Sequence, residues 1–263
     1  MPHTQSFYEP SVKKTEGGKL NWTGKITINY SQFTKPLEEK KPTIFFVSSM
    51  SDIFHKGVSF EAIDNIFDVM SKCPHHTFKV LTKRAERMYD WFAWKQEGNG
   101  HKYDQWPLPN VQLGVSVENQ KYADERIPFL QKCPAKAKFL SCEPLLGPVN
   151  LYKHDKLKGI HQVIVGGESG HEARPMHPEW VSMIHSHCIE ANTAFWFKQW
   201  GEWMPSDGAT SGKKLIMLSY MGAIIQDPLD CKVQMAQIMI KVGAKAAGDL
   251  LYGKQYHEQP IVE

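Results

Sequence analysis

The sequence predicts an α/β protein built around a parallel, TIM-like (β/α) barrel that is partial, with an N-terminal arm before it and a C-terminal capping segment after it. Three observations predict this class. Short apolar runs rich in β-branched and aromatic residues alternate with amphipathic stretches, and each step between runs has room for a crossover helix. No G-x-G-x-x-G loop follows any run, which disfavours the alternative of a doubly wound open sheet that binds a dinucleotide. Charged residues follow five of the six runs, as is typical of a barrel mouth.

The composition indicates a folded chain with a sizeable core. Of the 263 residues, 41% are apolar and 22% are charged, which excludes wholesale disorder and fibrous architecture. The formal net charge of +3 does not indicate a general electrostatic nucleic-acid binder. The amino terminus lacks the apolar stretch of a signal peptide, and no run approaches the ~18 apolar residues needed to span a bilayer. We therefore expect a soluble, cytoplasmic protein with no membrane partner.

Residues 1–42 are predicted to form an arm or hairpin outside the barrel. This stretch is polar, with one short alternating run at Ile26, Ile28 and Tyr30 and a charged connector, KPLEEKKP. Residues 43–203 are predicted to form the barrel core. Its expected strands are 44–47, 78–81, 111–115, 138–140, 162–165 and 194–197.

Two crossover helices of the core are predicted in detail. Between the first two strands, Ser59 suits the N-cap of a helix. The apolar face of that helix consists of Phe60, Ile63, Phe67 and Met70. Before the last strand, Pro178 suits the first turn of another helix. The residues that this helix turns toward the sheet are Trp180, Met183, Ile184 and Cys188.

Residues 204–263 are predicted to form a strand and helix extension packed on the core. The stretch MPSDGATSGKK is typical of a loop, and KLIMLSYMGAII of one or two strands. The stretch from Lys232 to Leu251 is predicted to form an amphipathic helix that closes at Gly253.

A cluster of polar residues follows each predicted strand. The carboxyl ends of parallel barrel strands share one face, where sites of this architecture are built. Capping of the next helix accounts for Ser, Asp and Asn at such positions, but not for a charged residue just beyond five strands. We therefore predict a pocket for a small molecule or a nucleotide at this face. Its candidate catalytic residues are Lys83, Glu118, Glu143, Glu168 and Lys198, and its candidate ligand-binding residues are Ser49, Asp52, Arg84, Asn119, Gly166, Gly167 and Gln199.

The chemistry of this pocket is left open by the residue types. Three carboxylates facing two lysines suit acid–base catalysis, a divalent cation, or a buried ion network that fixes loop geometry. The pair Gly166–Gly167 either lets a ligand approach the backbone or only makes a turn. The aromatic run at 195–203 suits a strand core better than a base-stacking surface.

The cysteines and histidines predict neither a metal site nor disulfides. The sequence has twelve histidines and five cysteines, but no HExxH motif and no His/Cys quartet. The cysteines are scattered and odd in number, as expected of reduced thiols.

Several long strings of this sequence carry a family resemblance. In order, they are FVSSMSDIFH, FKVLTKRAERM, LPNVQLGVSVENQKYADERIPFL, KFLSCEPLLGPV, VIVGGESGHEARPMHPEWV and FWFKQWGEW. They closely resemble an uncharacterised family of phage and bacterial proteins that is similar to the radical SAM barrels, over about residues 43–203. The later string KVGAKAAGDLLYGKQYHEQP resembles the terminal segment of that family. The resemblance implies a phage-related protein with a radical-SAM-like barrel.

The same resemblance suggests a [4Fe-4S] cluster and S-adenosylmethionine as cofactors. Typical family members have a cysteine-rich loop ending in C-x-x-C-Y, similar to the loop that holds the cluster in radical SAM enzymes. In this sequence no cysteine precedes Cys73, and cluster ligation requires several thiolates brought together. The residues themselves therefore predict that the chain binds no cluster.

Two functions remain open at this level. The first is a barrel enzyme, or a former enzyme, with its pocket at the carboxyl ends of the strands. The alternative is a non-catalytic module of phage or mobile-element origin that binds a nucleotide, a nucleic acid or a protein. A local basic strip favours the nucleic-acid version. It consists of Lys79, Lys83, Arg84 and Arg87.

Overall fold

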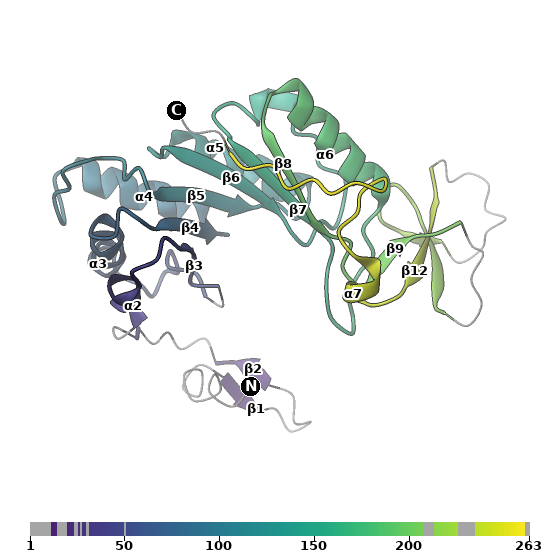
Figure 1. Cartoon of the computed structure of the whole chain (residues 1–263), viewed down its shortest axis with the longest axis horizontal. Coiled ribbons are helices and arrows are strands. Elements are labelled where there is room, and N and C mark those ends of the chain that lie inside the picture. Colours follow the sequence, from purple (N-terminus) through teal and green to yellow (C-terminus); the bar gives the residue numbers. More distant parts are fainter. Residues whose placement is uncertain are drawn as a thin grey trace.

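A six-stranded parallel sheet forms the centre of the protein. The computed structural model describes residues 12–14, 20–23, 26, 28–29, 32–49, 51–207, 213–225 and 235–260. The strands are β3 (Ile44–Val47), β4 (Thr77–Thr82), β5 (Val111–Ser116), β6 (Ala137–Cys142), β7 (Gln162–Gly166) and β8 (Ala194–Gln199). They lie in sequence order without a reversal, which excludes the doubly wound alternative. The sheet curls into a half-barrel that does not close, so the prediction of a partial parallel barrel is confirmed (Figure 1).

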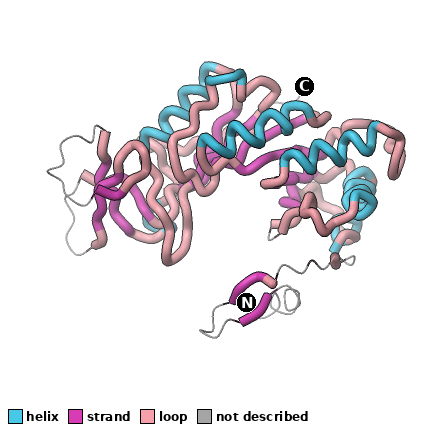
Figure 2. The backbone as a smooth tube through the Cα atoms, turned by 180° about the vertical axis from the view of Figure 1, so that it is seen from behind, coloured by secondary structure: helices cyan, strands magenta, loops and turns pink. Residues whose placement is uncertain are grey.

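The crossover helices gather on one side of this sheet, as Figures 1 and 2 show from opposite directions. They are α3 (Phe60–Ser71), α4 (Ala85–Gln96), α5 (Gln120–Lys132) and α6 (Pro178–Glu190), whereas β6 and β7 are joined through a 3-10 turn at Lys153–Asp155. The core lies between the helices and alternate strand residues such as Leu113, Leu140 and Val163. No helix in the part of the chain described here is both long and apolar enough to cross a bilayer.

The two helices predicted in detail are confirmed. Ser59 caps α3 through its side-chain oxygen, which accepts a hydrogen bond from the backbone N–H of Ala62 at 3.2 Å. The buried residues of α3 include Ile63, Phe67 and Met70. Pro178 is the first residue of α6. The buried residues of that helix include Trp180, Ile184 and Cys188, whereas Met183 is only half-buried.

The interior of the half-barrel is filled by side chains. Lys79 of β4 reaches across it, and its Nζ donates a hydrogen bond to Oε1 of Gln162 on β7 at 2.9 Å. The Phe139 ring lies against Gly114, where an added Cβ atom would come within 2.4 Å of the ring. Glycine at position 114 therefore makes room for the aromatic side chain of the neighbouring strand.

The N-terminal residues contain a separate two-stranded antiparallel hairpin of β1 (Val12–Lys14) and β2 (Leu20–Trp22). A short helix, α2 (Lys35–Glu38), precedes β3. The hairpin does not involve the alternating run noted in the sequence, because Ile26 and Ile28 lie outside any strand and Tyr30 lies outside the described residues.

The C-terminal extension forms a second, antiparallel sheet in the order β11-β10-β12-β9. Its strands are β9 (Trp203–Pro205), β10 (Leu215–Leu218), β11 (Ile224–Ile225) and β12 (Gln237–Lys241). For residues 214–225 one or two strands were expected, and the structure has two, β10 and β11. The loop expected from residue 204 begins later, because Met204 and Pro205 pair with β12.

The predicted helix from Lys232 to Leu251 is wrong. Residues 232–234 lie outside the described part of the chain, and the rest contains β12 followed by the short helix α7 (Ala244–Ala247). Ile240 of β12 pairs with Met204 on one side and Leu215 on the other, so long-range pairing overrides the local helical preference. Gly243, with φ of +88°, separates the strand from α7.

The last described residues cover the β8 edge of the half-barrel. His257 forms an antiparallel bridge with Trp196, and the backbone N–H of Phe197 donates to the carbonyl of Tyr256 at 2.8 Å. The carbonyl of Glu258 also accepts a hydrogen bond from the Gln162 side chain at 2.7 Å. This segment is the yellow strand-like trace that runs along β8 in Figure 1.

Candidate functional site at the carboxyl edge of the half-barrel

The loops at the carboxyl ends of β5 to β8 are tied together by main-chain hydrogen bonds of 2.8–2.9 Å. The donor and acceptor pairs are Leu146 to Glu118, Leu145 to Gly166, Gly167 to Gln199 and Glu202 to Glu168. The predicted charged residues therefore project from a connected backbone.

Asp52 connects the loop after β3 to the turn after β4. Its carboxylate accepts hydrogen bonds from Thr82 Oγ1 at 2.8 Å, from the backbone N–H of Lys83 at 3.2 Å and from Arg84 Nη1 at 2.7 Å. The Asp52 side chain is 14% exposed, against 40% for Arg84. Arg84 is thus the accessible member of this pair.

Glu118, after β5, binds two cations. Its carboxylate oxygens lie 2.6 Å from Lys83 Nζ and 2.8 Å from Arg126 Nη1. Burial acts to raise the pKa of Glu118, but the hydrogen bond from Lys83 and the charge of Arg126 outweigh it, so the pKa lies below its ordinary value. Glu118 and Arg126 are 7% and 11% exposed, whereas Lys83 is 57% exposed.

Glu143, after β6, pairs with Lys198 of β8 at 2.9 Å. Gln199 approaches the same carboxylate at 3.5 Å and donates to Ser169 Oγ at 3.1 Å. An added Cβ atom at Gly166 would lie 3.2 Å from the Glu143 side chain. Gly166 therefore gives this carboxylate its space.

Glu168, after β7, pairs with Arg174 in a bidentate arrangement. Its oxygens lie 2.9 Å from Arg174 Nε and 2.8 Å from Nη2, and the backbone N–H of Arg174 donates to it at 2.8 Å. These hydrogen bonds hold the pKa of Glu168 below its ordinary value. The Glu168 side chain is 24% exposed and that of Arg174 is 60% exposed.

The other predicted binding residues have local structural contacts or lie free at the surface. Asn119 is the N-cap of α5 and accepts from the backbone N–H of Tyr122 at 3.3 Å. The space beside Gly167 is taken by the Trp200 carbonyl, which an added Cβ atom would meet at 1.9 Å, so this glycine serves packing within the chain. Ser49 is exposed at the end of β3.

Of the five predicted charged residues, all of which the structure describes, four thus form two ion pairs with each other, and the fifth, Glu168, does not pair with any of the other four. Lys83 binds Glu118 and Lys198 binds Glu143, while Glu168 binds a residue that was not predicted. Within the described ranges, no hydrogen bond or ion pair joins one of these groups to another. Each carboxylate lies beneath a more exposed cation, so the edge presents positive charge outward. We call this surface, formed by Lys83, Arg84, Arg174 and Lys198, the cationic rim.

Arg126 and Arg174 complete these ion pairs, and sequence reasoning missed both. Arg126 lies in α5, and its Nη1 also donates to the Ser116 carbonyl at 2.9 Å. Its spacing of eight residues from Glu118 is the only sequence signal for the contact, because that spacing places Arg126 in the second turn of the helix that follows Glu118.

The described cysteines do not fit an iron–sulfur cluster. Cys73, Cys133, Cys142 and Cys188 are free and buried, and Cys231 lies outside the described residues. Burial raises the pKa of the Cys133 and Cys188 thiols to about 12, which favours the thiol over the metal-binding thiolate. In the described ranges, no group of three His, Cys, Asp or Glu side chains is placed to hold a metal ion.

The fold and this edge define a half-barrel α/β protein whose strands end in a rim of ion pairs. Comparison with known families places it further. A family of proteins of unknown function, DUF5131, matches residues 4–260, and the chain belongs to this family. No curated protein and no solved structure matches the chain.

Proposed function

We propose that the half-barrel binds a small anionic molecule, a nucleotide or another phosphate- or carboxylate-bearing ligand, at the cationic rim. The observation that carries this proposal is the order of burial within each ion pair. Glu118 is 7% exposed beneath Lys83 at 57%, and Glu143 is 21% exposed beneath Lys198 at 53%. Accessible ammonium and guanidinium groups are the donors that phosphates and carboxylates use in proteins.

Lys83 is the cation that is best placed to contact a ligand. If Lys83 turns toward a ligand, Glu118 keeps its ion pair with the buried Arg126 and no unpaired charge is left in the protein. The contact that Lys83 gives up involves an exposed ammonium group, and such pairs contribute about 1 kcal/mol or less. Ligand binding therefore competes with a weak interaction.

A catalytic role for this site is a further part of the proposal, and it depends on the family resemblance. Similarity to the radical SAM barrels and to phage proteins supports a barrel enzyme, or a barrel that has kept only the binding site. The carboxylates of Glu118 and Glu168 have lowered pKa values and stay ionised at neutral pH. They therefore suit the orientation of cations better than the donation of protons.

A nucleic-acid ligand is less well supported, because the predicted basic strip does not form one surface. Lys79 Nζ points into the half-barrel toward Gln162. Arg87 donates to the Val58 carbonyl at 2.6 Å, and its guanidinium lies over the Phe60 ring. A compact anion that contacts only the rim fits the arrangement better than a polyanion.

The test is a calorimetric titration of the full chain with inorganic pyrophosphate and, separately, with ADP. Lys83→Met and Lys198→Met should each weaken binding about fivefold or more, as expected for the loss of a charge-assisted contact. Lys136→Met is the matched control, because Lys136 is an exposed lysine at the amino end of β6, the opposite edge of the sheet. Equal weakening by all three substitutions, or no binding of either probe, would refute a site at the rim.

A further inference from the structure

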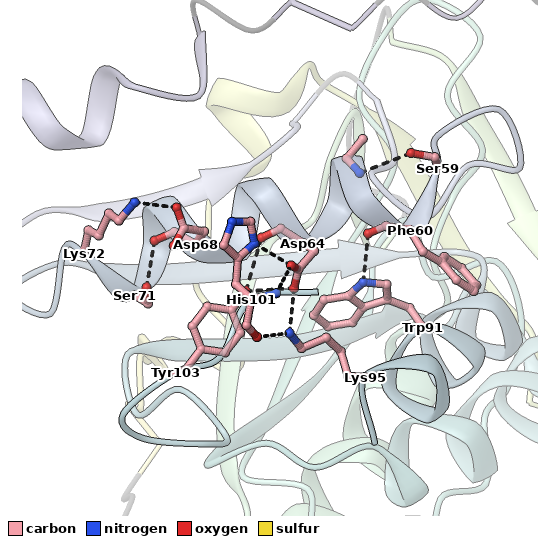
Figure 3. Close-up of polar contacts among 11 residues, drawn as sticks. Ser59, Phe60, Asp64, Asp68, Ser71, Lys72, Trp91, Lys95, His101 and Tyr103 are labelled. Carbon is pink, nitrogen blue, oxygen red and sulfur yellow. Dashed lines mark hydrogen bonds and ion pairs between the residues drawn. The ribbon is translucent and has the colours of Figure 1, made fainter. Parts of the chain in front are cut away.

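A second cluster of charged residues lies on the outer side of the protein, between α3 and the loop after α4 (Figure 3). At its centre is Asp64, which is buried. Its Oδ1 accepts from Lys95 Nζ at 2.8 Å and from the Tyr103 hydroxyl at 2.9 Å. Its Oδ2 accepts from the backbone N–H of His101 at 2.6 Å and lies 2.5 Å from His101 Nδ1. Gly100, with φ of +68°, allows this approach, because an added Cβ atom would lie 2.4 Å from Oδ2.

Asp64 is ionised, and its charge is cancelled within the cluster. Burial acts to raise the pKa of Asp64, but the hydrogen bonds from Lys95, His101 and Tyr103 outweigh it and lower the pKa. The Lys95 side chain is only 6% exposed and lies against this carboxylate. The buried pair therefore contributes no net charge to its surroundings.

The ionised carboxylate fixes the tautomer of His101. A carboxylate only accepts hydrogen bonds, so Nδ1 of His101 must carry a proton and donate it to Asp64. In the neutral imidazole, Nε2 then holds the free lone pair. The His101 side chain is 44% exposed, and among the described residues Nε2 has no hydrogen-bond partner. The hydrogen bonds from Nδ1 and from the backbone N–H of His101 to Asp64 anchor the loop after α4. The acceptor Nε2 plays no part in that anchoring.

His101 borders a surface pocket of about 280 Å³. The pocket is lined by Glu61, Asp64, Asn65, Trp94, Gly100 and His101. Glu61 and Asn65 are exposed and lie four residues apart on α3, so they share a face of that helix. Glu61 brings a carboxylate, Asn65 an amide oxygen and Trp94 an aromatic ring. Since the charges of Asp64 and Lys95 cancel, the carboxylate of Glu61 gives the pocket a net negative charge.

We propose that this pocket binds a primary alkylammonium group, with Glu61 as the ion-pair partner, His101 Nε2 as a hydrogen-bond acceptor and Trp94 as the aromatic wall. An ammonium group has three N–H donors and no acceptor, which complements the acceptors around the pocket. Cations also bind over aromatic rings, most strongly over tryptophan. The same chemical group occurs in free polyamines and in lysine side chains. This site is separate from the cationic rim and has the opposite charge preference.

The test is an NMR titration of the full chain at about pH 8, where imidazole side chains are largely neutral. The His101 ring signal, assigned from its absence in His101→Asn, should shift as n-butylammonium is added, with about millimolar affinity. Tetramethylammonium, which has no N–H donor, should bind more weakly. Stronger binding of spermidine would identify a free polyamine as the ligand source, and stronger binding of Nα-acetyl-lysine N-methylamide would identify a lysine side chain.

Two variants and a matched control make the result specific. Glu61→Gln should weaken butylammonium binding about fivefold. Glu86→Gln is the control, because Glu86 is an exposed acidic residue in the first turn of the neighbouring helix α4. His101→Asn keeps the backbone contact and a side-chain donor for Asp64 but removes Nε2. Binding by this variant is followed through the indole signal of Trp94, which also lines the pocket, and should be about tenfold weaker while the melting temperature is retained.

Three results would overturn the proposal. The first is the absence of any His101 shift at saturating butylammonium. The second is equal affinity for butylammonium and tetramethylammonium, which would show that the acceptors do not take part. The third is equal weakening of butylammonium binding by Glu61→Gln and Glu86→Gln, which would identify the pocket as a nonspecific acidic surface. A His101 signal that shifts with Zn²⁺ but not with butylammonium falls under the first result and would identify the pocket as a metal site.

Discussion

The two cations that bind Glu118 should differ sharply in their contribution to stability. Replacing Arg126 by methionine removes an almost fully buried partner and its hydrogen bond to the Ser116 carbonyl. The buried Glu118 carboxylate then loses one partner, and the buried Ser116 carbonyl loses its donor. Together these losses should lower the free energy of unfolding by about 2–4 kcal/mol. Replacing Lys83 by methionine removes a 57% exposed ammonium, for which about 1 kcal/mol or less is expected.

Thermal and urea unfolding of the two variants, followed by circular dichroism, measures this difference. For a domain of this size about 1 kcal/mol corresponds to a shift of roughly 2–4 °C, so Arg126→Met should lower the melting temperature by roughly 4–16 °C and Lys83→Met by less than about 4 °C. Lys136→Met again serves as the control for loss of an exposed lysine. Equal losses for Lys83 and Arg126 would show that Lys83 is a structural partner, and would remove the reason for assigning it to a ligand.

Three further predictions follow from other parts of the molecule. Gly114→Ala should destabilise the protein by about 1–3 kcal/mol in urea unfolding, because the new methyl group overlaps the Phe139 ring; an unchanged midpoint would contradict the close packing of the interior. Since the folded pKa of Glu118 is lowered, its stabilising contribution is complete above the ordinary glutamate pKa of about 4.3 and is lost as the pH falls through the folded value. The urea midpoint should therefore fall more steeply between about pH 5 and pH 3 in the wild type than in Glu118→Gln, and parallel curves would refute this. After anaerobic reconstitution, the chain should contain no stoichiometric iron and acid-labile sulfide, because its described thiols are buried; one cluster per chain would show that this reasoning fails.

The strands of the half-barrel were predictable because each is a short run of apolar, β-branched or aromatic residues between amphipathic stretches. Runs such as residues 44–47 and 162–165 match β3 and most of β7. The C-terminal helix was mispredicted because Met235, Ala236 and Gln237 favour helix locally. Their environment is decided by pairing with β9 and β10, residues that lie distant in the chain. Local preference carries no information about such partners.

The candidate site was predictable only as a set of positions. Parallel strands place the residues that follow them at one edge, so the location of Glu118, Glu143 and Glu168 follows from the strand assignment. Their partners do not, because Arg174 comes from the loop before α6 and Arg126 from α5. The Asp64 cluster was missed for the same reason: its contacts join residues 31 to 39 positions apart, and no motif marks them.

Main-chain hydrogen bonds connect the loops after β5 to β8, so side chains at this edge can be substituted while the loop backbone keeps its geometry. Because they use only backbone atoms, these bonds do not depend on the side chains of Glu143, Glu168 and Lys198. Glu143, Glu168 and Lys198 can then be exchanged together in a combinatorial library while the scaffold keeps its geometry. Recognition of a new ligand can in this way be selected at the edge without redesign of the core, as in folds whose variable loops stand on a constant framework.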